Sequence, residues 1–255
     1  MKKSQDRIKD WWEDSSKWYQ KDAKIHTRAA HYGPYAPDED KLRLLGKVKG
    51  KKILEIGCGG GQCSIAFAKE GANVTGVDIS EEQLKYAENL AKKNKVKVKF
   101  VQSDVQTLKQ FKSNGYDIVF STWALQYIPD LKKCFKEVHR ILKKNGLFVF
   151  SFGHPFHENI NPKTTKLKYN YNKPGKVVET ETWADGKKHT FIMFKRRISD
   201  IYDAIVESGL TLEKILEPVK LKGQKAWTSD PFTDDFSLKL AKMVPPTIIF
   251  KTRKK

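Results

Sequence analysis

The sequence predicts an α/β fold with a doubly wound, mainly parallel sheet of seven strands. From residue 52 onward, short apolar runs alternate with amphipathic stretches of helical length, which is the order of elements in such a sheet. The first unit, 52–80, holds an apolar run, a glycine-rich turn, an apolar helix face and a second apolar run that ends at Asp78. We therefore expect a strand, a tight turn, a helix and a second, parallel strand in this segment.

The remaining elements follow in the same alternation. Strands are predicted at 53–56, 74–77, 97–101, 116–121, 147–152, 210–216 and 247–252. Helices are predicted from the glycine turn to Gly71 and at 81–93, 130–142 and 199–208. Ser80 is expected to cap the helix at 81–93, because Glu81 and Glu82 follow in its first turn.

Two segments lie outside this alternation. The first 50 residues are rich in aromatic side chains, and 6–24 has the pattern of an amphipathic helix that packs on the sheet edge, closes over a ligand as a lid, or does both. A short helix is predicted at 38–45, and 158–190 predicts an inserted hairpin or flap that covers the substrate. The expected organisation is a lid at 1–50, a core at 51–153, an insertion at 154–190 and the rest of the core sheet at 191–255.

The glycine turn and the acids beside it indicate a ligand site. Glycine lets a ligand approach the backbone closely, and Asp78, at the tip of the second strand, can accept hydrogen bonds from ribose hydroxyls. Glu55 lies two residues before Gly57, inside the strand end, where an unpaired carboxylate is costly to bury. A carboxylate at this place favours a ligand that has a cationic group and no phosphate. A turn that binds phosphate, or binds nothing, is the alternative.

The motif Glu55, Gly57, Gly59, Gly61 and Asp78 resembles the first two motifs of the Rossmann-type, or class I, S-adenosylmethionine-dependent methyltransferases. The resemblance implies methyltransferase activity, S-adenosylmethionine as the cofactor and an antiparallel hairpin of the last two strands. It also implies that Asp104, after the third strand, accepts a hydrogen bond from the adenine amino group; capping of the next short helix is the alternative. The residues expected to bind the cofactor are Tyr19, Tyr32, Glu55, Gly57, Cys58, Gly59, Gly61, Asp78, Ile79, Gln83, Asp104, Val105, Thr122 and Gln126.

Later segments resemble a broad group of small methyltransferases whose substrates are mostly unassigned. The resemblance rests on a His-Pro element at 154–155, a Trp-x-Asp-Gly element at 183–186 and the run at 197–218. That group often has His-Arg before the last helix, where this chain has Arg-Arg at 196–197. The sequence therefore contains no counterpart of that histidine at this place.

Candidate catalytic residues follow from the chemistry of methyl transfer. Transfer from a sulfonium is an in-line displacement, so the protein mainly aligns the acceptor and excludes water. An amine acceptor needs only to be neutral, whereas a hydroxyl or a carbon acid needs a base. His154 and His31 are the candidate bases, with a structural role as the alternative for each. The Asn-Pro-Pro-Tyr and Asp-Pro-Pro-Tyr motifs of methyltransferases that act on nucleobase or glutamine amines are absent from the sequence.

Composition leaves three functions open. The formal charge of +19 suits contact with RNA, but the excess consists of lysines spread along the chain. The three cysteines are too few and wrongly spaced for a zinc site, so no metal is expected. No apolar run approaches the roughly 20 residues that span a membrane, and a reducing cytoplasm is the expected location. We expect a methyltransferase acting on a small molecule; a tRNA or rRNA methyltransferase and a non-catalytic cofactor-binding partner subunit are the alternatives, and the oligomeric state is left open.

Overall fold

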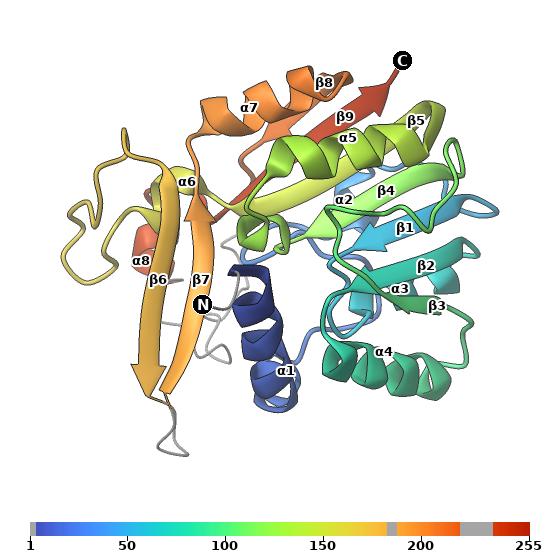
Figure 1. Ribbon diagram of the computed structural model, residues 1–255, viewed down its shortest axis with the longest axis horizontal. Coiled ribbons are helices and arrows are strands. Elements are labelled where there is room, and N and C mark those ends of the chain that lie inside the picture. Colours follow the sequence, from blue (N-terminus) through green and yellow to red (C-terminus); the bar gives the residue numbers. More distant parts are fainter. Residues whose placement is uncertain (1–3, 183–187, 220–236) are drawn as a thin grey trace.

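The computed structural model describes residues 4–182, 188–219 and 237–255, and one seven-stranded sheet forms its centre (Figure 1). Its strands are β1 (Lys52–Ile56), β2 (Asn73–Asp78), β3 (Lys99–Gln102), β4 (Tyr116–Thr122), β5 (Leu142–Gly153), β8 (Leu210–Leu216) and β9 (Thr247–Lys254). Their order in the sheet is β3-β2-β1-β4-β5-β9-β8. Neighbours from β3 to β5 are parallel, whereas β9 is antiparallel to both β5 and β8. The predicted mainly parallel sheet with an antiparallel last strand is confirmed.

The helices between the strands form where their sequences predict them. α5 is an example, because Leu131, Phe135 and Val138 recur at helical spacing and all are buried. Asp130 caps this helix by accepting a hydrogen bond of 2.9 Å from the backbone N–H of Lys133. The helices that follow strands are α3 (Gln62–Lys69), α4 (Glu81–Lys93), α5 (Leu131–Ile141) and α7 (Ile198–Glu207). The other described elements are α1 (Ser4–Ala23), α2 (Glu39–Leu42), the 3₁₀ helix η1 (Leu125–Tyr127), α6 (Pro155–Glu158), β6 (Gly175–Thr182), β7 (Lys188–Lys195) and α8 (Leu238–Ala241).

The core consists of one apolar layer on each face of the sheet. Because successive side chains of a strand point to opposite faces, Leu54 belongs to the layer that includes α5 and α7. Ile53, on the same strand, belongs to the layer that includes α3 and the segment preceding β1. Helices therefore cover both faces, and the parallel strands β1, β2 and β4 all end at one edge of the sheet.

The helix predicted at 38–45 is a single turn, α2. The buried carboxylate of Glu39 accepts hydrogen bonds from the backbone N–H groups of Leu44 and Leu45, at 3.0 and 2.7 Å. These amides are satisfied outside a helix, and Arg43 ends the turn with a left-handed φ of 51°. A side chain of α2 itself therefore replaces the helical hydrogen bonds that the sequence pattern predicts.

Helix α1 is fastened to the core through Glu13. Its carboxylate accepts hydrogen bonds from Ser80 Oγ and from the backbone N–H groups of Glu81 and Glu82, at 3.0, 2.9 and 2.9 Å. Ser80 is the predicted cap of α4, and it accepts a hydrogen bond from the N–H of Gln83. Glu13 thus satisfies two further orphan N–H groups at the start of α4, where a negative charge is favourable.

The insertion after β5 forms the expected hairpin, which packs on the opposite side of α1 (Figure 1). Strands β6 and β7 are antiparallel and pair along their whole length. The ring centroids of Trp11 on α1 and Phe191 on β7 are 5.0 Å apart, and Lys176 Nζ on β6 donates to Ser4 Oγ at 2.9 Å. The Trp-x-Asp-Gly element at 183–186 lies outside the described residues. Helix α1 therefore lies between the core and the hairpin, in the place expected of a lid.

Candidate active site

The turn between β1 and α3 requires glycine for two physical reasons. Gly57, Gly59 and Gly61 have φ values of 66°, 48° and 75°, in the region that other residues rarely adopt. A Cβ added at Gly57 would also lie 2.2 Å from the Cβ of Ala124, and one at Gly60 would lie 2.5 Å from Gln20 Nε2. The turn opens onto a cavity at the carboxyl edge of the sheet, which we call the turn cavity.

Two of the predicted acids lie in this cavity with their oxygens held in place. Asp78 accepts hydrogen bonds from the backbone N–H groups of Gly59 and Ser80, at 2.8 and 3.0 Å, and burial raises its pKa despite these bonds. Asp104 accepts from the N–H of Gln106 at 2.9 Å and from Gln5 Nε2 of α1 at 3.0 Å. Asp104 stabilises a turn here and caps no α-helix, since the structure has none between β3 and β4.

Glu55 is the third acid of the turn cavity, and it is almost fully buried in β1. Its one described side-chain partner is the hydroxyl of Ser64, which donates at 2.5 Å. Burial, with a smaller contribution from the nearby negative charge of Asp78, raises the pKa of Glu55 to about 8. At neutral pH the carboxyl is therefore mostly protonated, and a cation placed beside it would favour the ionised form.

Side chains of α1 form the opposite wall of the turn cavity, and one of their contacts was not predicted. Gln20 donates to Gln83 Oε1 at 2.7 Å and accepts from Gln62 Nε2 at 2.6 Å, so three amides join α1, α3 and α4. The Nε2 of Gln83 has no hydrogen-bond partner among the described residues, although it is buried. The signal that could have revealed Gln20 is a polar residue on the buried face of an amphipathic helix.

His31 and Tyr32 are adjacent in sequence, but the structure separates them. His31 lines the turn cavity, and its buried Nδ1 has no hydrogen-bond partner in the described chain. Burial lowers the pKa of His31 to about 4, so the ring is neutral. Tyr32 lies in the core layer next to α3, fully buried, and its hydroxyl donates to Glu39 at 2.6 Å. Tyr32 therefore does not line the turn cavity, contrary to its predicted role at the cofactor.

Both ring nitrogens of His154 form hydrogen bonds within the protein. Its Nδ1 accepts hydrogen bonds from the backbone N–H groups of Phe156 and His157, at 3.1 and 3.4 Å, which caps α6. Because Nδ1 is an acceptor, Nε2 carries the proton and donates to Glu217 at 2.7 Å. Both ring nitrogens are engaged, and His154 lines neither of the two cavities described here. This geometry does not support the prediction that His154 is a catalytic base.

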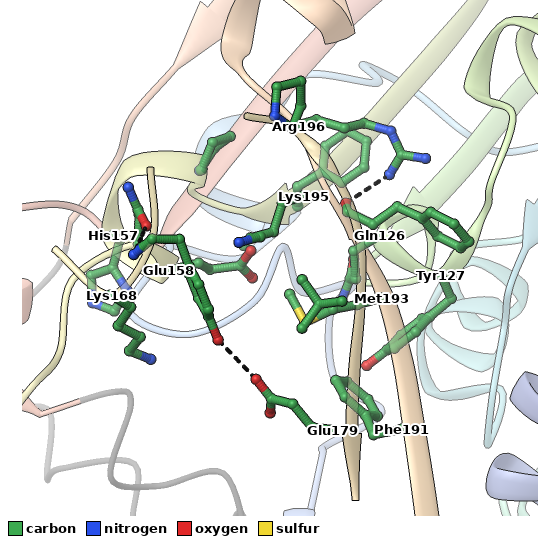
Figure 2. Close-up of a pocket in the computed structure, with 18 of the residues that line it drawn as sticks. Gln126, Tyr127, His157, Glu158, Lys168, Glu179, Phe191, Met193, Lys195 and Arg196 are labelled. Atoms are coloured by element: carbon green, nitrogen blue, oxygen red, sulfur yellow. Dashed lines mark hydrogen bonds between the residues drawn. The ribbon is translucent and has the colours of Figure 1, made fainter. Parts of the chain in front are cut away.

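A second and larger cavity lies beside the first, between β7, η1 and the segment after α6 (Figure 2). Its volume is about 210 Å³, against about 120 Å³ for the turn cavity. We call it the hairpin cavity. Four aromatic residues line both cavities and so form the boundary between them: Trp12, Tyr19, Trp123 and Tyr127.

Close packing holds this aromatic boundary. The ring centroids of Trp12 and Tyr19 are 5.3 Å apart, and those of Trp12 and Tyr127 are 5.4 Å apart, in edge-to-face geometry. Trp123 has a left-handed φ of 52°, and its indole lies so close to Gly33 that a Cβ there would be 1.8 Å from Nε1. Gly33, in the aromatic-rich segment before β1, thus makes room for the side chain that separates the two cavities.

The structure brings most of the predicted cofactor residues together and places three elsewhere. Tyr32 lies in the core, and Gly61 begins α3 without lining the turn cavity. Gln126 lines the hairpin cavity instead. The predicted residues that line the turn cavity are Tyr19, Glu55, Gly57, Cys58, Gly59, Asp78, Ile79, Gln83, Asp104, Val105 and Thr122.

The site contains neither a reactive thiol nor a metal centre among the described residues. Burial raises the pKa of the Cys58 thiol well above its ordinary value, which keeps it protonated and a poor nucleophile. In the part of the chain that the structure describes, no three His, Cys, Asp or Glu side chains gather as metal ligands would.

Comparison with known proteins decides the family. A family model described as a methyltransferase domain matches residues 47–215, from before β1 to within β8. The chain belongs to the methyltransferase domain family. It is a class I enzyme that uses S-adenosylmethionine, and its sheet has the Rossmann-like order of that class. Within the described residues, none of the helices combines the length and the apolar character needed to cross a membrane.

Individual relatives match to different extents. An uncharacterized protein of Haemophilus influenzae is 28% identical over 228 residues, which cover 84% of this chain and 85% of that protein. The ubiquinone biosynthesis O-methyltransferase of Bordetella avium is 35% identical over 121 residues, and the match covers 48% of each chain. A solved S-adenosylmethionine-dependent methyltransferase of Mesorhizobium loti has the same fold, with a TM-score of 0.59 at 23% identity over 83% of this chain and 94% of that one. The chain thus aligns with about half the length of the relative whose reaction is named.

Proposed function

We propose that this enzyme transfers a methyl group from S-adenosylmethionine in the turn cavity to a small molecule in the hairpin cavity. The observation that carries the proposal is the boundary of Trp12, Tyr19, Trp123 and Tyr127, which lines both cavities. A donor and an acceptor in these two cavities would meet among aromatic side chains that exclude water. Alignment and exclusion of water are the main tasks of a protein in this reaction.

The residues of the turn cavity fit the groups of the methyl donor. Asp78 suits the ribose hydroxyls, Asp104 suits the adenine amino group, and Glu55 suits a positively charged group. The buried Nδ1 of His31 and Nε2 of Gln83, which lack described partners, are further hydrogen-bonding positions. When bound, S-adenosylmethionine supplies an electrophilic methyl carbon: the acceptor's lone pair forms a bond to that carbon, and the electrons of the breaking C–S bond pass to sulfur.

Helix α1 closes the turn cavity in this arrangement. Gln5, Trp12 and Gln20 of this helix line the cavity, and Glu13 attaches the helix to the start of α4. Gln5 also holds Asp104, the residue assigned to the adenine amino group. We therefore expect α1 to shield the reacting groups from water when the donor is bound.

The proton of the acceptor leaves by a route that depends on the acceptor. A neutral amine attacks without prior loss of a proton, so no base is needed. For a hydroxyl, His157 is better placed than His154 or His31, because His157 alone among these three lines the hairpin cavity. Burial lowers the pKa of His157 to about 4, so its ring is neutral at physiological pH.

A small acceptor is favoured over RNA by the hairpin cavity and by one relative. The hairpin and α1 both contribute to the lining of this cavity, whereas the lysine excess is spread over the chain. The Bordetella avium relative is named as an O-methyltransferase of ubiquinone biosynthesis, a small-molecule pathway. The similarity covers 48% of this chain, so it supports the reaction class more than the acceptor.

The proposal is tested by combining donor binding with label transfer. Calorimetry should detect S-adenosylmethionine binding, and Asp78→Ala should weaken it by about tenfold or more, because a hydrogen bond to a charged group contributes roughly 1.5–3 kcal/mol. Asp203→Ala, on the exposed face of α7, is the matched control and should bind normally. Methyl-labelled donor incubated with cell extract should label small metabolites. Absence of donor binding, or label confined to RNA, would refute the proposal.

A further inference from the structure

The hairpin cavity contains a lysine, Lys195, that forms no salt bridge with a described residue. Lys195, on β7, lines this cavity, and its Nζ lies 3.2 Å from the centroid of the Tyr169 ring. The cation is thus placed against an aromatic face and makes no salt bridge with a described residue. Burial lowers the pKa of Lys195 more than the carboxylate of Glu179 raises it. An anion in the cavity would stabilise this partly desolvated ammonium.

Two carboxylates lie in the wall of the hairpin cavity, those of Glu179 and Glu158. Glu179 accepts a hydrogen bond of 2.8 Å from the hydroxyl of Tyr169 (Figure 2). Glu158 folds against Gly153, where an added Cβ would lie 1.7 Å from Glu158 Oε1. The charged residues in the described lining are Glu158, Glu179, Lys168, Lys173, Lys195 and Arg196. The basic residues outnumber the acidic ones, so the lining favours an anionic ligand.

The guanidinium of Arg196 donates to backbone carbonyl groups of the protein, so we assign the binding of the anion to Lys195. Its Nη2 donates to the backbone carbonyl of Ile128, and its Nη1 donates to that of Phe194 at 3.0 Å. Burial lowers the pKa of Arg196 to about 10, which still leaves it charged. The arginine therefore fixes the position of η1 relative to β7, at the place where the sequence has no counterpart of the family histidine.

A second donor lies beside the same aromatic residue. Asn159 accepts a hydrogen bond of 3.0 Å from the backbone N–H of Tyr169, and this bond orients its carboxamide. The Nδ2 of Asn159 is buried and has no partner among the described residues, and the side chain lines the hairpin cavity. Asn159 thus contacts the backbone of Tyr169 and Lys195 lies over its ring, so the hairpin cavity has two donors beside this residue, and donors of this kind bind a carboxylate.

The end of the hairpin cavity beside the aromatic boundary has a neutral amide, Gln126, in place of a cation. Gln126 is only 7% exposed, and its buried Oε1 has no hydrogen-bond partner in the described chain. It lies between Trp123 and Tyr127 in sequence, and both of these line the boundary with the turn cavity. In Figure 2, Lys195 extends toward the side of Lys168, whereas Gln126 and Tyr127 lie across the cavity. A ligand that satisfies both ends must carry an anion at one end and a hydrogen-bonding group at the other.

We propose that the methyl acceptor is an aromatic acid that carries a hydroxyl or an amino group. The carboxylate binds Lys195 and Asn159, the ring lies among the aromatic side chains of the wall, and the hydroxyl or amine faces Gln126 beside the donor. Methylation then forms a bond from this oxygen or nitrogen to the methyl carbon as the C–S bond breaks, and the acceptor's proton passes to solvent or to a neutral base. This proposal rests on the proposed function, since it assigns the acceptor of that reaction.

The test measures binding of defined probes to the donor-loaded protein by calorimetry. The probes are 4-hydroxybenzoate, 6-hydroxy-2-naphthoate, the methyl ester of each, and benzoate. The acids should bind at least about tenfold more tightly than their esters, and 4-hydroxybenzoate should bind more tightly than benzoate. Lys195→Met should remove the preference for acid over ester, whereas Lys188→Met, at the exposed start of the same strand, should retain it. Gln126→Leu should remove the preference for the hydroxyl.

The outcomes separate this proposal from the proposed function. Equal binding of acids and esters, tighter binding of the esters, or no binding of any probe would overturn the aromatic acid as acceptor. Donor binding measured in the same samples reports on the turn cavity, so its loss would count against the proposed function instead. Retention of the acid preference in Lys195→Met would likewise overturn the assignment of Lys195, provided that circular dichroism shows the variant to be folded.

Discussion

Replacement of Glu55 by glutamine should raise the stability of the protein by an amount that grows with pH. The carboxyl is buried in β1, and its pKa is raised from 4.5 to about 8 in the folded state. Between these values the folded state binds more protons than the unfolded state, so the free energy of unfolding falls as pH rises. Each unit of pKa difference corresponds to about 1.4 kcal/mol. The contribution of Glu55 should therefore become less favourable by about 3.5 kcal/mol between pH 5 and pH 8.

Glutamine is the matched replacement, because its carbonyl can still accept the hydrogen bond from Ser64 and its volume is unchanged. Urea unfolding of wild type and Glu55→Gln at pH 5, 6.5 and 8 gives the difference in free energy of unfolding at each pH. That difference should be small at pH 5 and largest at pH 8. A difference that stays constant across this range would show that Glu55 does not titrate as the buried environment requires.

The same variant reports on the donor. If a cationic group binds beside Glu55, donor affinity in the wild type should increase with pH up to about 8, by nearly tenfold per pH unit, because the ionised carboxyl is the binding form. Glu55→Gln should bind the donor more weakly at pH 8 and with little pH dependence. An affinity profile of the variant that follows the wild type would contradict this role.

Two further predictions concern the boundary and the histidine. Gly33→Ala should displace the Trp123 indole, because the added Cβ would lie 1.8 Å from Nε1 of that indole. The variant should therefore show changed tryptophan fluorescence and a donor affinity lowered by about tenfold. Gly46→Ala is the control for backbone strain alone, since Gly46 has a φ of 69° and open space around it. His154→Gln should lower the free energy of unfolding by about 1–2 kcal/mol through loss of the α6 cap and the Glu217 contact, while donor binding and the pH profile of methyl transfer stay unchanged. A shifted pH profile with unchanged stability would restore His154 as a base.

The local sequence pattern predicted most of the helices and strands, because apolar periodicity and capping residues act within the segment that contains them. The apolar runs and caps predicted α4 from Glu81 and the strand β8 at 210–216 as the structure has them. The short α2 was mispredicted, since its end depends on Glu39 bonding amides beyond the helix. Helix boundaries set by such side chains cannot be read from periodicity.

The sequence by itself determined the fold class, the methyl-donor family and the acids at the ends of β1 and β2. Parallel strands that alternate with helices must end at one edge of the sheet, so Glu55 and Asp78 come together whatever the loops do. Only the tertiary structure decided that Gln126 faces the hairpin cavity, that Tyr32 is core, and that His154 is bonded to Glu217. Such outcomes depend on contacts between segments that are distant in sequence, and no local spacing encodes them; His154 and Glu217, for example, are 63 positions apart.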